Sequence, residues 1–170
     1  MAVRIGKLPD SSMVATKIGV MRTVTCASPT LLAGQGTPRE PNDLLLLRLP
    51  CVTADTYMPF PYWRFRKPRS GATFDVAVLP HLTVTTAEAA IQAATRAVGV
   101  ARLLHYQAVE AVERGELKTL LEAYEPEPVP VHLVHASRRQ MPATMRHFVD
   151  FAVPRLKQRL TAITSAQPPV

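Results

Sequence analysis

The sequence predicts an α/β fold. Signals for strands and helices alternate along the 170 residues, and residues 82–104 have the strand, helix, strand order of a crossover unit. Hydrophobic residues make up 47% of the chain, so it can bury a sizeable core, and its length suits one domain or two small lobes. We therefore expect a globular protein in which helices connect β-strands.

The N-terminal third predicts short strands separated by turns. Ala2–Ile5 is a short apolar run, and Met21–Cys26 is a β-branched run, so both suit strands. Pro29 can open a short helix over Thr30–Ala33, which glycines then close. A turn with two prolines leads to the apolar run Leu44–Leu47.

The next segment predicts a buried strand, a loop and a hairpin. Cys51–Thr53 suits a buried strand, whereas two prolines make Pro59–Tyr62 a loop. Apolar and polar residues alternate in Trp63–Arg66 and again in Phe74–Leu79, with a turn at Gly71 between them. An aromatic and arginine run can also clamp nucleic acid, but the alternation already explains the aromatics as a core-facing row.

Residues 82–104 form the predicted crossover. Leu82–Val84 suits a strand, Ala89–Val98 an alanine-rich helix and Val100–Leu104 a second strand, with Gly99 placed to follow the helix. A crossover of this kind joins parallel strands with a right-handed connection. In open α/β sheets, small ligands bind at the carboxyl ends of such strands.

Two threonines stand at the start of this predicted helix. Thr85 and Glu88 have the spacing of a capping box, and Thr86 is their neighbour. Backbone N–H groups and the helix dipole at this end favour a carboxylate or a similar anion. The alternative is that Thr85 only caps the helix.

The C-terminal third continues the alternation. The predicted elements are a helix at His105–Arg114 and strands at Leu117–Leu121 and Val131–Val134. The stretch EPEPVP at 125–130 predicts an extended linker between lobes. A last helix follows Ser137–Arg139, holds Pro142 in its first turn, has apolar residues at helical spacing from Met145 to Leu156, and has Pro154 as a predicted kink.

The chain is basic. Lys and Arg total 20 against 13 acidic residues, so the net charge is +7, which fits an anionic partner such as nucleic acid, a membrane surface or an acidic ligand. The basic residues are scattered, which favours a solvated face. Neither Arg64–Arg69 nor Arg155–Arg159 has the turn and recognition helix that read duplex DNA, so we expect no sequence-specific DNA binding by this chain.

The sequence predicts a reduced, cytoplasmic protein. Cys26 and Cys51 lie in apolar surroundings without metal-ligand spacing, which favours buried thiols. The N-terminus lacks the apolar region of a signal peptide, and no run of about 18 apolar residues could span a membrane.

No catalytic or metal motif stands out. The sequence lacks the GxSxG and HExxH patterns and a glycine-rich phosphate loop. His132 and His135 flank two residues of a predicted strand, so they face opposite sides and cannot share a metal. We expect no enzyme activity and no cofactor.

Four ordered motifs resemble the effector-binding domain of LysR-type transcriptional regulators. They are RIGKLPDSS at 4–12, CASPTLLAGQGTP at 26–38, AAIQAATRAVGVA at 89–101, and PVHLVHASRR at 130–139 followed by RHFVDF at 146–151. The resemblance covers nearly the whole chain and is tightest from Leu82 to Leu156.

The resemblance implies a fold and its boundaries. The expected fold is α/β and periplasmic-binding-protein-like type II, with two lobes, a central cleft and an incomplete first lobe. Residues 1–29 and 130–164 would form the partial first lobe, residues 30–129 the second lobe, and residues 165–170 a disordered tail. In this family a winged helix-turn-helix, a linker helix and the first part of lobe one come earlier, so the chain is expected to be truncated at its N-terminus.

The resemblance also implies a function. A small anionic effector would bind between the lobes and control transcription through a DNA-binding domain that this sequence lacks. The expected effector contacts are Arg4 near the hinge, Thr53 at the end of a strand, and Thr85 and Thr86 at the helix N-terminus. A dimer is expected.

An alternative function comes from another class of protein. A chain that begins inside lobe one could be an interaction module that dimerises with full-length regulators and has no ligand of its own. Uncovered apolar surface around Ala2–Ile5 and beneath the Met145–Leu156 helix would then promote association.

Overall fold

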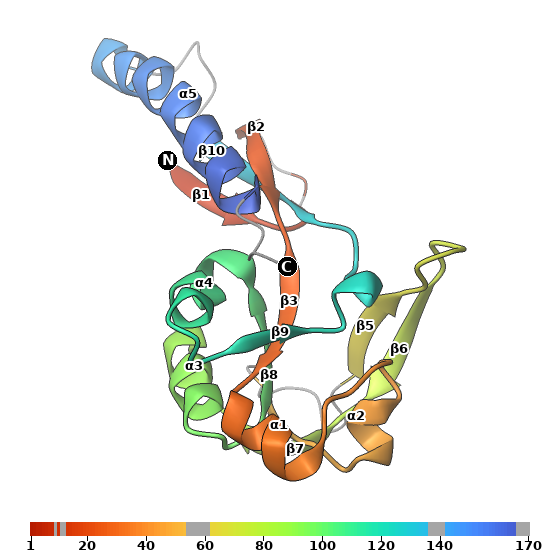
Figure 1. The fold of residues 1–170 in the computed structure, drawn as a ribbon. Helices are drawn as coiled ribbons and strands as arrows, with labels where there is room; N and C mark the ends of the chain where they lie inside the picture. Colours follow the sequence, from red (N-terminus) through yellow and green to blue (C-terminus); the bar gives the residue numbers. More distant parts are fainter. Residues whose placement is uncertain (9, 11–12, 54–61, 136–141, 166–170) are drawn as a thin grey trace. The chain divides into compact units, whose positions relative to one another are not determined.

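The computed structural model describes residues 1–8, 10, 13–53, 62–135 and 142–165 (Figure 1). The chain divides into two compact units, which we call unit 1 (Met1–Arg22 with Pro128–Val170) and unit 2 (Thr23–Glu127). The lobe boundaries that the resemblance implies stay a prediction. Of the expected C-terminal tail, residues 166–170 lie outside the described residues.

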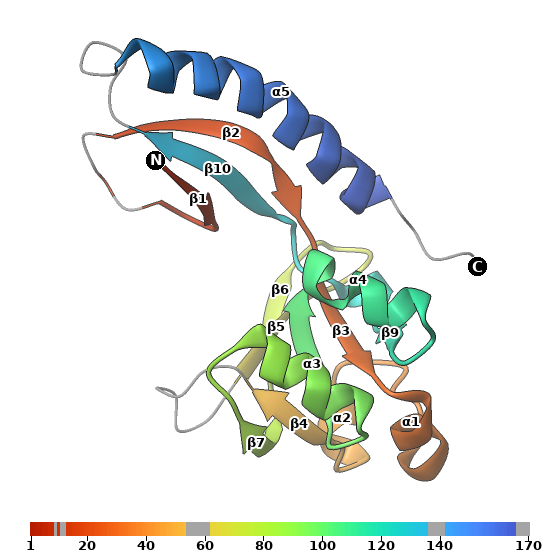
Figure 2. The same ribbon diagram turned by 90° about the vertical axis from the view of Figure 1, so that its left-hand side faces the viewer.

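Unit 1 is a three-stranded antiparallel sheet with one long helix. Its strands have the order β1 (Ala2–Ile5), β10 (Val129–His135) and β2 (Val14–Met21). Helix α5 (Ala143–Ser165) runs through Pro154 and packs against β2, as Figure 2 shows. Val131, Leu133 and Val149 are buried between the sheet and the helix.

Unit 2 contains a five-stranded mixed sheet. Its strands have the order β7 (Leu79–Thr83), β4 (Pro50–Thr53), β8 (Val100–Leu104), β3 (Thr23–Ala27) and β9 (Lys118–Leu120). Strand β4 is parallel to both of its neighbours, β7 and β8, whereas β3 is antiparallel to β8 and β9. Three parallel strands therefore end at one edge of this sheet.

Hydrophobic clusters cover both faces of this sheet. On one face α3 (Ala87–Thr95) and α4 (His105–Glu113) bury small side chains such as Ala94 against Val52 and Ala101. The cluster on the other face joins the sheet to α1 (Pro29–Gln35), α2 (Asp43–Leu46), the β5 (Tyr62–Arg66) and β6 (Thr73–Ala77) hairpin, and the 3-10 turn η1 (Glu122–Tyr124).

Most of the predicted elements are confirmed. Strands form at Ala2–Ile5 and Val100–Leu104 as expected, and the hairpin alternates so that Trp63 and Phe65 are buried. The apolar run after Asp43 is helix α2. Residues 59–61, predicted to lie in a loop, and residues 137–139, predicted to precede the last helix, lie outside the described residues.

Each of two predicted strands is divided between two observed strands. The run Met21–Cys26 was predicted as one strand, but β2 ends at Met21 and β3 begins at Thr23, because Arg22 marks the passage from one sheet to another. Similarly, Phe74–Leu79 spans the end of β6 and the start of β7, which belong to different sheets.

The predicted crossover is present, but a third strand lies between its two strands. Strands β7 and β8 are parallel and connected by α3, yet β4 pairs with each of them. Gly99 allows this arrangement because a Cβ at that position would lie 2.6 Å from the Pro50 carbonyl oxygen. No side chain larger than hydrogen fits there, so β8 can approach the backbone of β4 closely.

The predicted caps of α3 are wrong by a few residues. The N-cap is Thr86, whose hydroxyl oxygen accepts from the Ala89 N–H at 3.2 Å, so the capping box expected for Thr85 does not form. At its other end the helix closes on Arg96, followed by Ala97 with a φ of 61°, rather than on Gly99.

Candidate functional site

The carboxyl ends of β4, β7 and β8 meet at one edge of the unit 2 sheet. Thr53 ends β4 and lies opposite Thr83, the last residue of β7, while Val52 lies opposite Ala101 of β8. Small ligands bind in open α/β sheets at this kind of edge, because loops and helix N-termini converge there. We call this region the ligand edge and define it by Thr53, Thr86, Arg102 and the pocket described below.

Thr53 holds two strand ends together. Its side chain is buried, and its hydroxyl oxygen lies 3.0 Å from that of Thr83. Its carbonyl oxygen accepts a hydrogen bond from the Val84 N–H at 2.8 Å. These contacts fix the chain just before it enters α3.

The N-terminus of α3 follows directly. Thr86 uses its side chain as the cap, whereas Thr85 is exposed. A helix leaves its first N–H groups without intrahelical partners, and the helix dipole adds partial positive charge at the same place. The ligand edge is therefore suited to an anion.

A pocket of about 360 Å³ opens at this edge. Its lining combines the first residue of α3, the end of β8, the start of α4 and one aromatic side chain of the hairpin. The residues are Thr23, Trp63, Ala87, Arg102, Leu103, Leu104 and Gln107. The Gln107 side chain is held in place because its Oε1 accepts from the Leu104 N–H at 2.9 Å.

Arg102 is the cation of this pocket. Its guanidinium lies 5.0 Å from the centre of the Phe65 ring, and one of its N–H groups donates to the Arg64 carbonyl oxygen. Burial lowers the pKa of Arg102 to about 10, an effect that the nearby Asp75 carboxylate opposes. The group is therefore still charged at neutral pH, but poorly hydrated.

The Asp75 carboxylate is already engaged by another arginine. Asp75 accepts two hydrogen bonds from Arg64, at 2.8 and 2.9 Å. In the part of the chain that the structure describes, no carboxylate forms a salt bridge with Arg102. The pocket thus presents a desolvated cation that can pair with an anionic group from outside.

The structure brings together three of the four residues predicted to contact an effector. Thr53, Thr85 and Thr86 lie at the ligand edge, whereas Arg4 is an exposed residue of β1 in unit 1, opposite His132. Their contact with an effector stays a prediction. Sequence reasoning missed Arg102, although a charged residue inside the otherwise apolar strand VARLL was a signal for it.

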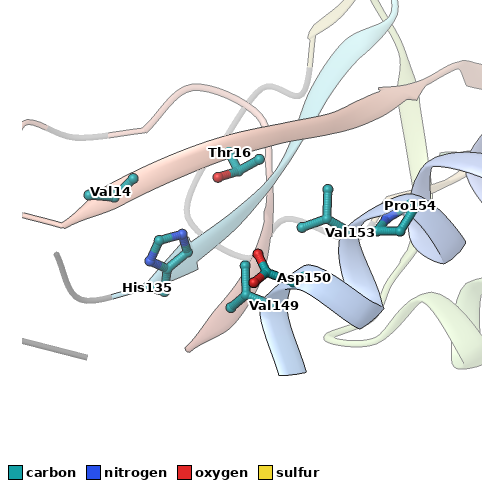
Figure 3. Close-up of a pocket in the computed structure, with 7 residues that line it drawn as sticks. All are labelled: Val14, Thr16, His135, Val149, Asp150, Val153 and Pro154. Atoms are coloured by element: carbon teal, nitrogen blue, oxygen red, sulfur yellow. The ribbon is translucent and has the colours of Figure 1, made fainter. Parts of the chain in front are cut away.

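Unit 1 has a pocket of its own, of about 470 Å³. Figure 3 shows that Val14, Thr16 and His135 line it from the sheet, and that Val149, Asp150, Val153 and Pro154 line it from α5. Pro154 has no N–H, so the helix cannot form its usual bond to the Asp150 carbonyl. None of the described residues that line this pocket is an arginine or a lysine, which distinguishes them from the lining of the ligand edge.

The described residues lack two other kinds of feature. They contain no group of three or more His, Cys, Asp or Glu side chains that could hold a metal ion. Among the same residues, no helix combines the length and the hydropathy needed to cross a bilayer.

Comparison with known families decides the assignment. The family model described as the LysR substrate binding domain matches residues 1–157, which is most of the chain. The chain belongs to the LysR substrate-binding domain family. The resemblance seen in the sequence motifs is thereby confirmed, and with it the connection to transcription regulation.

The curated relatives are HTH-type transcriptional regulators of greater length. The chain is 26% identical over 150 residues to the HTH-type transcriptional regulator YcaN of Escherichia coli, covering 88% of this chain and 48% of YcaN. It is 28% identical over 151 residues to the regulator PtxR of Pseudomonas aeruginosa, covering 88% and 47%. The chain thus spans about half the length of the curated relatives it matches.

Solved structures show the fold. The regulatory domain of CrgA from Neisseria meningitidis matches with a TM-score of 0.74 and 25% identity, over 91% of this chain and 74% of that domain. Full-length AphB of Vibrio cholerae matches with a TM-score of 0.77 and 20% identity, over 90% of this chain and 50% of AphB. The α/β fold of this chain is therefore the periplasmic-binding-protein-like type II fold of LysR-type regulatory domains.

Proposed function

We propose that this chain is the ligand-sensing part of a LysR-type transcriptional regulator and that the ligand edge of unit 2 binds a small anionic effector. The observation that carries the proposal is the pairing of Arg102 with the N-terminus of α3 around one pocket. Both groups attract negative charge, and both lie at the strand ends where α/β sheets bind ligands.

The lining of the pocket suggests the chemical class of the effector. Arg102 and the first N–H groups of α3 suit a carboxylate, while Trp63, Leu103 and Leu104 offer apolar contact. Thr85 and Thr86 would donate hydrogen bonds from their backbone, and Thr53 would hold the edge in shape. A small carboxylic acid with an apolar body fits this combination.

Regulation would follow from differential binding. An effector that favours one arrangement of the two units over another shifts their populations, and Arg4 of unit 1 would contribute from the second side of the cleft. A DNA-binding domain outside this sequence would read the promoter, and the complete regulator would act as a dimer in the cytoplasm. Neither catalysis nor specific DNA recognition by this chain is part of the proposal.

The test is a binding screen with a matched variant. Small aromatic and aliphatic carboxylates are titrated into the 170-residue chain by calorimetry, with the corresponding primary amides as neutral controls. We expect carboxylates to bind and amides not to bind. Replacing Arg102→Gln removes a charged hydrogen-bond donor and should raise the Kd of a bound carboxylate about tenfold or more.

The control variant is Arg114→Gln. Arg114, the C-cap residue of α4, forms exposed ion pairs with Glu110 and Glu116, so its removal should change neither binding nor folding much. Thermal unfolding without ligand shows whether Arg102→Gln still folds. Equal binding of carboxylates and amides, or equal loss in both variants, contradicts the proposal.

A second candidate function is an interaction module that pairs with full-length regulators. The exposed apolar side chains of unit 1, among them Val3, Phe148 and Phe151, favour it. The two functions are separable, because the module needs no carboxylate ligand and should bind a full-length relative in a pull-down without any effector.

A further inference from the structure

The pocket of the ligand edge contains one polar side chain that the proposed function does not use. Gln107 lines the pocket together with Arg102, and it is the half-buried third residue of α4. A glutamine amide has two donor N–H bonds on its nitrogen and an oxygen that only accepts. The contacts of its two ends therefore decide what this side chain can recognise.

The start of α4 fixes the orientation of the Gln107 amide. Its Oε1 accepts from the Leu104 N–H at 2.9 Å, which is the bond that the third residue makes in a capping box. A backbone N–H can only donate, so the atom that faces it must be the amide oxygen. The oxygen is thus engaged, and Nε2 is the end left for another partner.

The Nε2 end has a donor to spare. It lies 3.4 Å from the Tyr106 hydroxyl, which is long for a hydrogen bond. Nε2 carries two N–H bonds, so this contact engages one of them at most. Because Gln107 lines the pocket, the second N–H is a donor that a bound molecule can use.

The other polar side chains of the lining also favour acceptors on the ligand. The Arg102 guanidinium and the Trp63 indole N–H donate and do not accept, and the Thr23 hydroxyl can do either. Among the described residues of this lining, none is an aspartate or a glutamate. A ligand with two acceptor groups matches this lining better than one that carries an amine.

We infer that Gln107 determines specificity at the ligand edge, and that the effector carries a neutral acceptor, such as a ketone oxygen, besides its carboxylate. The inference rests on the proposed function, in which Arg102 and the N-terminus of α3 bind the carboxylate. Gln107 Nε2 donates to the second oxygen. The pocket of about 360 Å³ suits a small molecule, so the effector class is a small oxo acid with an apolar body.

The test compares acids that differ by one carbonyl oxygen. Hexanoate and its 2-oxo, 4-oxo and 5-oxo derivatives are titrated into the 170-residue chain by calorimetry. The derivatives place the ketone at different distances from the carboxylate. At least one of them should bind about three- to tenfold more tightly than hexanoate, because it gains one net hydrogen bond and hexanoate leaves the Gln107 N–H without a partner.

Gln107→Glu separates recognition from capping. Glutamate at the third helix position accepts from the N-cap N–H as glutamine does, so the start of α4 is kept. An ionised carboxylate has no N–H to donate. The preference for the oxo acid, measured as the ratio of the two Kd values, should therefore disappear. Thermal unfolding without ligand shows whether the variant is folded.

Two further variants complete the test. Gln107→Met removes the amide without adding a charge, so it should also abolish the preference, and it decides the question if Gln107→Glu does not fold. The matched control is Gln92→Glu on α3, where the exposed Gln92 accepts a hydrogen bond from Arg96. This control adds the same charge outside the described lining of the pocket and should keep the preference for the oxo acid.

Three outcomes overturn the inference. If no oxo acid binds more tightly than hexanoate, while Arg102→Gln weakens the binding of hexanoate, the proposed function stands and Gln107 has no part in selection. If the preference persists in both Gln107 variants, another group contacts the ketone oxygen. If neither hexanoate nor any oxo acid binds, the proposed function fails and this inference fails with it.

Discussion

The two units of this molecule differ in how completely their sheets are covered. The five-stranded sheet of unit 2 has helices on one face and helices with a hairpin on the other, and its core residues such as Phe65 and Leu44 are almost fully buried. The three-stranded sheet of unit 1 has α5 on one face, and Phe148 and Phe151 of that helix are half exposed. Stability should therefore be concentrated in unit 2.

This difference bears on function. A binding site needs side chains held in fixed positions by packing. The ligand edge belongs to the well-covered sheet, so Arg102 and the cap of α3 rest on a rigid base. Unit 1 instead carries half-exposed apolar side chains on α5, which suit association.

The largest expected effect on stability comes from a substitution in the core of unit 2. Phe65→Ala removes a side chain that is 1% exposed and should lower the free energy of unfolding by about 3–5 kcal/mol. Trp63, the one tryptophan of the sequence, lies in unit 2, so its fluorescence in urea reports this transition. Phe151→Ala in unit 1 is the matched change and should leave the same transition nearly unmoved. Equal shifts contradict the comparison.

Substitutions at two glycines should give the next largest effects on stability, with opposite signs. Gly99→Ala forces a Cβ against the Pro50 carbonyl and should cost about 1–3 kcal/mol. Gly34→Ala, in α1, meets no atom within 4 Å and should stabilise the protein by about 0.5–1 kcal/mol. Urea midpoints measure both. Stabilisation by Gly99→Ala would show that β4 and β8 are not closely packed.

The buried thiols make unit 2 sensitive to alkali. Burial raises the pKa of Cys26 from 9.0 to about 12. Below pH 9 the thiol is protonated in both states, but between pH 9 and 12 only the unfolded chain loses the proton, so folding stability falls by up to about 1.4 kcal/mol per pH unit. Urea unfolding at pH 8 and pH 10 measures this loss, which Cys26→Ala should reduce. An unchanged slope in the variant would show that Cys26 is not buried.

The smallest effect concerns the cap of α3. Thr86→Ala removes the side-chain oxygen that accepts from Ala89 and should cost about 1 kcal/mol, whereas Thr85→Ala should change stability by less than about 0.5 kcal/mol. Thermal unfolding compares the two variants. A larger loss of stability in Thr85→Ala than in Thr86→Ala would support the capping box predicted from the sequence.

Local patterns predicted much of this fold. Alternating residues gave the hairpin strand of Trp63 and Phe65, and the alanine-rich run gave α3 between parallel strands. Local patterns could not show that β4 lies between β7 and β8, because strand order depends on pairing between distant residues. Whether Thr85 or Thr86 is the N-cap depends on where the helix begins to within one residue. Sequence spacing alone does not resolve a helix end that finely.

The candidate site was predicted only in part, for the same physical reason. The threonines follow strands in sequence, so their position at a strand end could be inferred. Arg102 needed the tertiary structure: its burial comes from the hairpin ring of Phe65, and Arg64 rather than Arg102 binds the carboxylate of Asp75. None of these contacts is local in the sequence.

The central claim is that an anionic effector binds at the ligand edge of unit 2. The direct measurement is an NMR titration of the isotope-labelled chain with a carboxylate found in the screen, following backbone amides and the Arg102 Nε–H. We predict the largest shift changes at Ala87, Glu88 and Arg102, and their loss in Arg102→Gln. Shift changes confined to the unit 1 pocket of Thr16, His135 and Asp150 would contradict the claim.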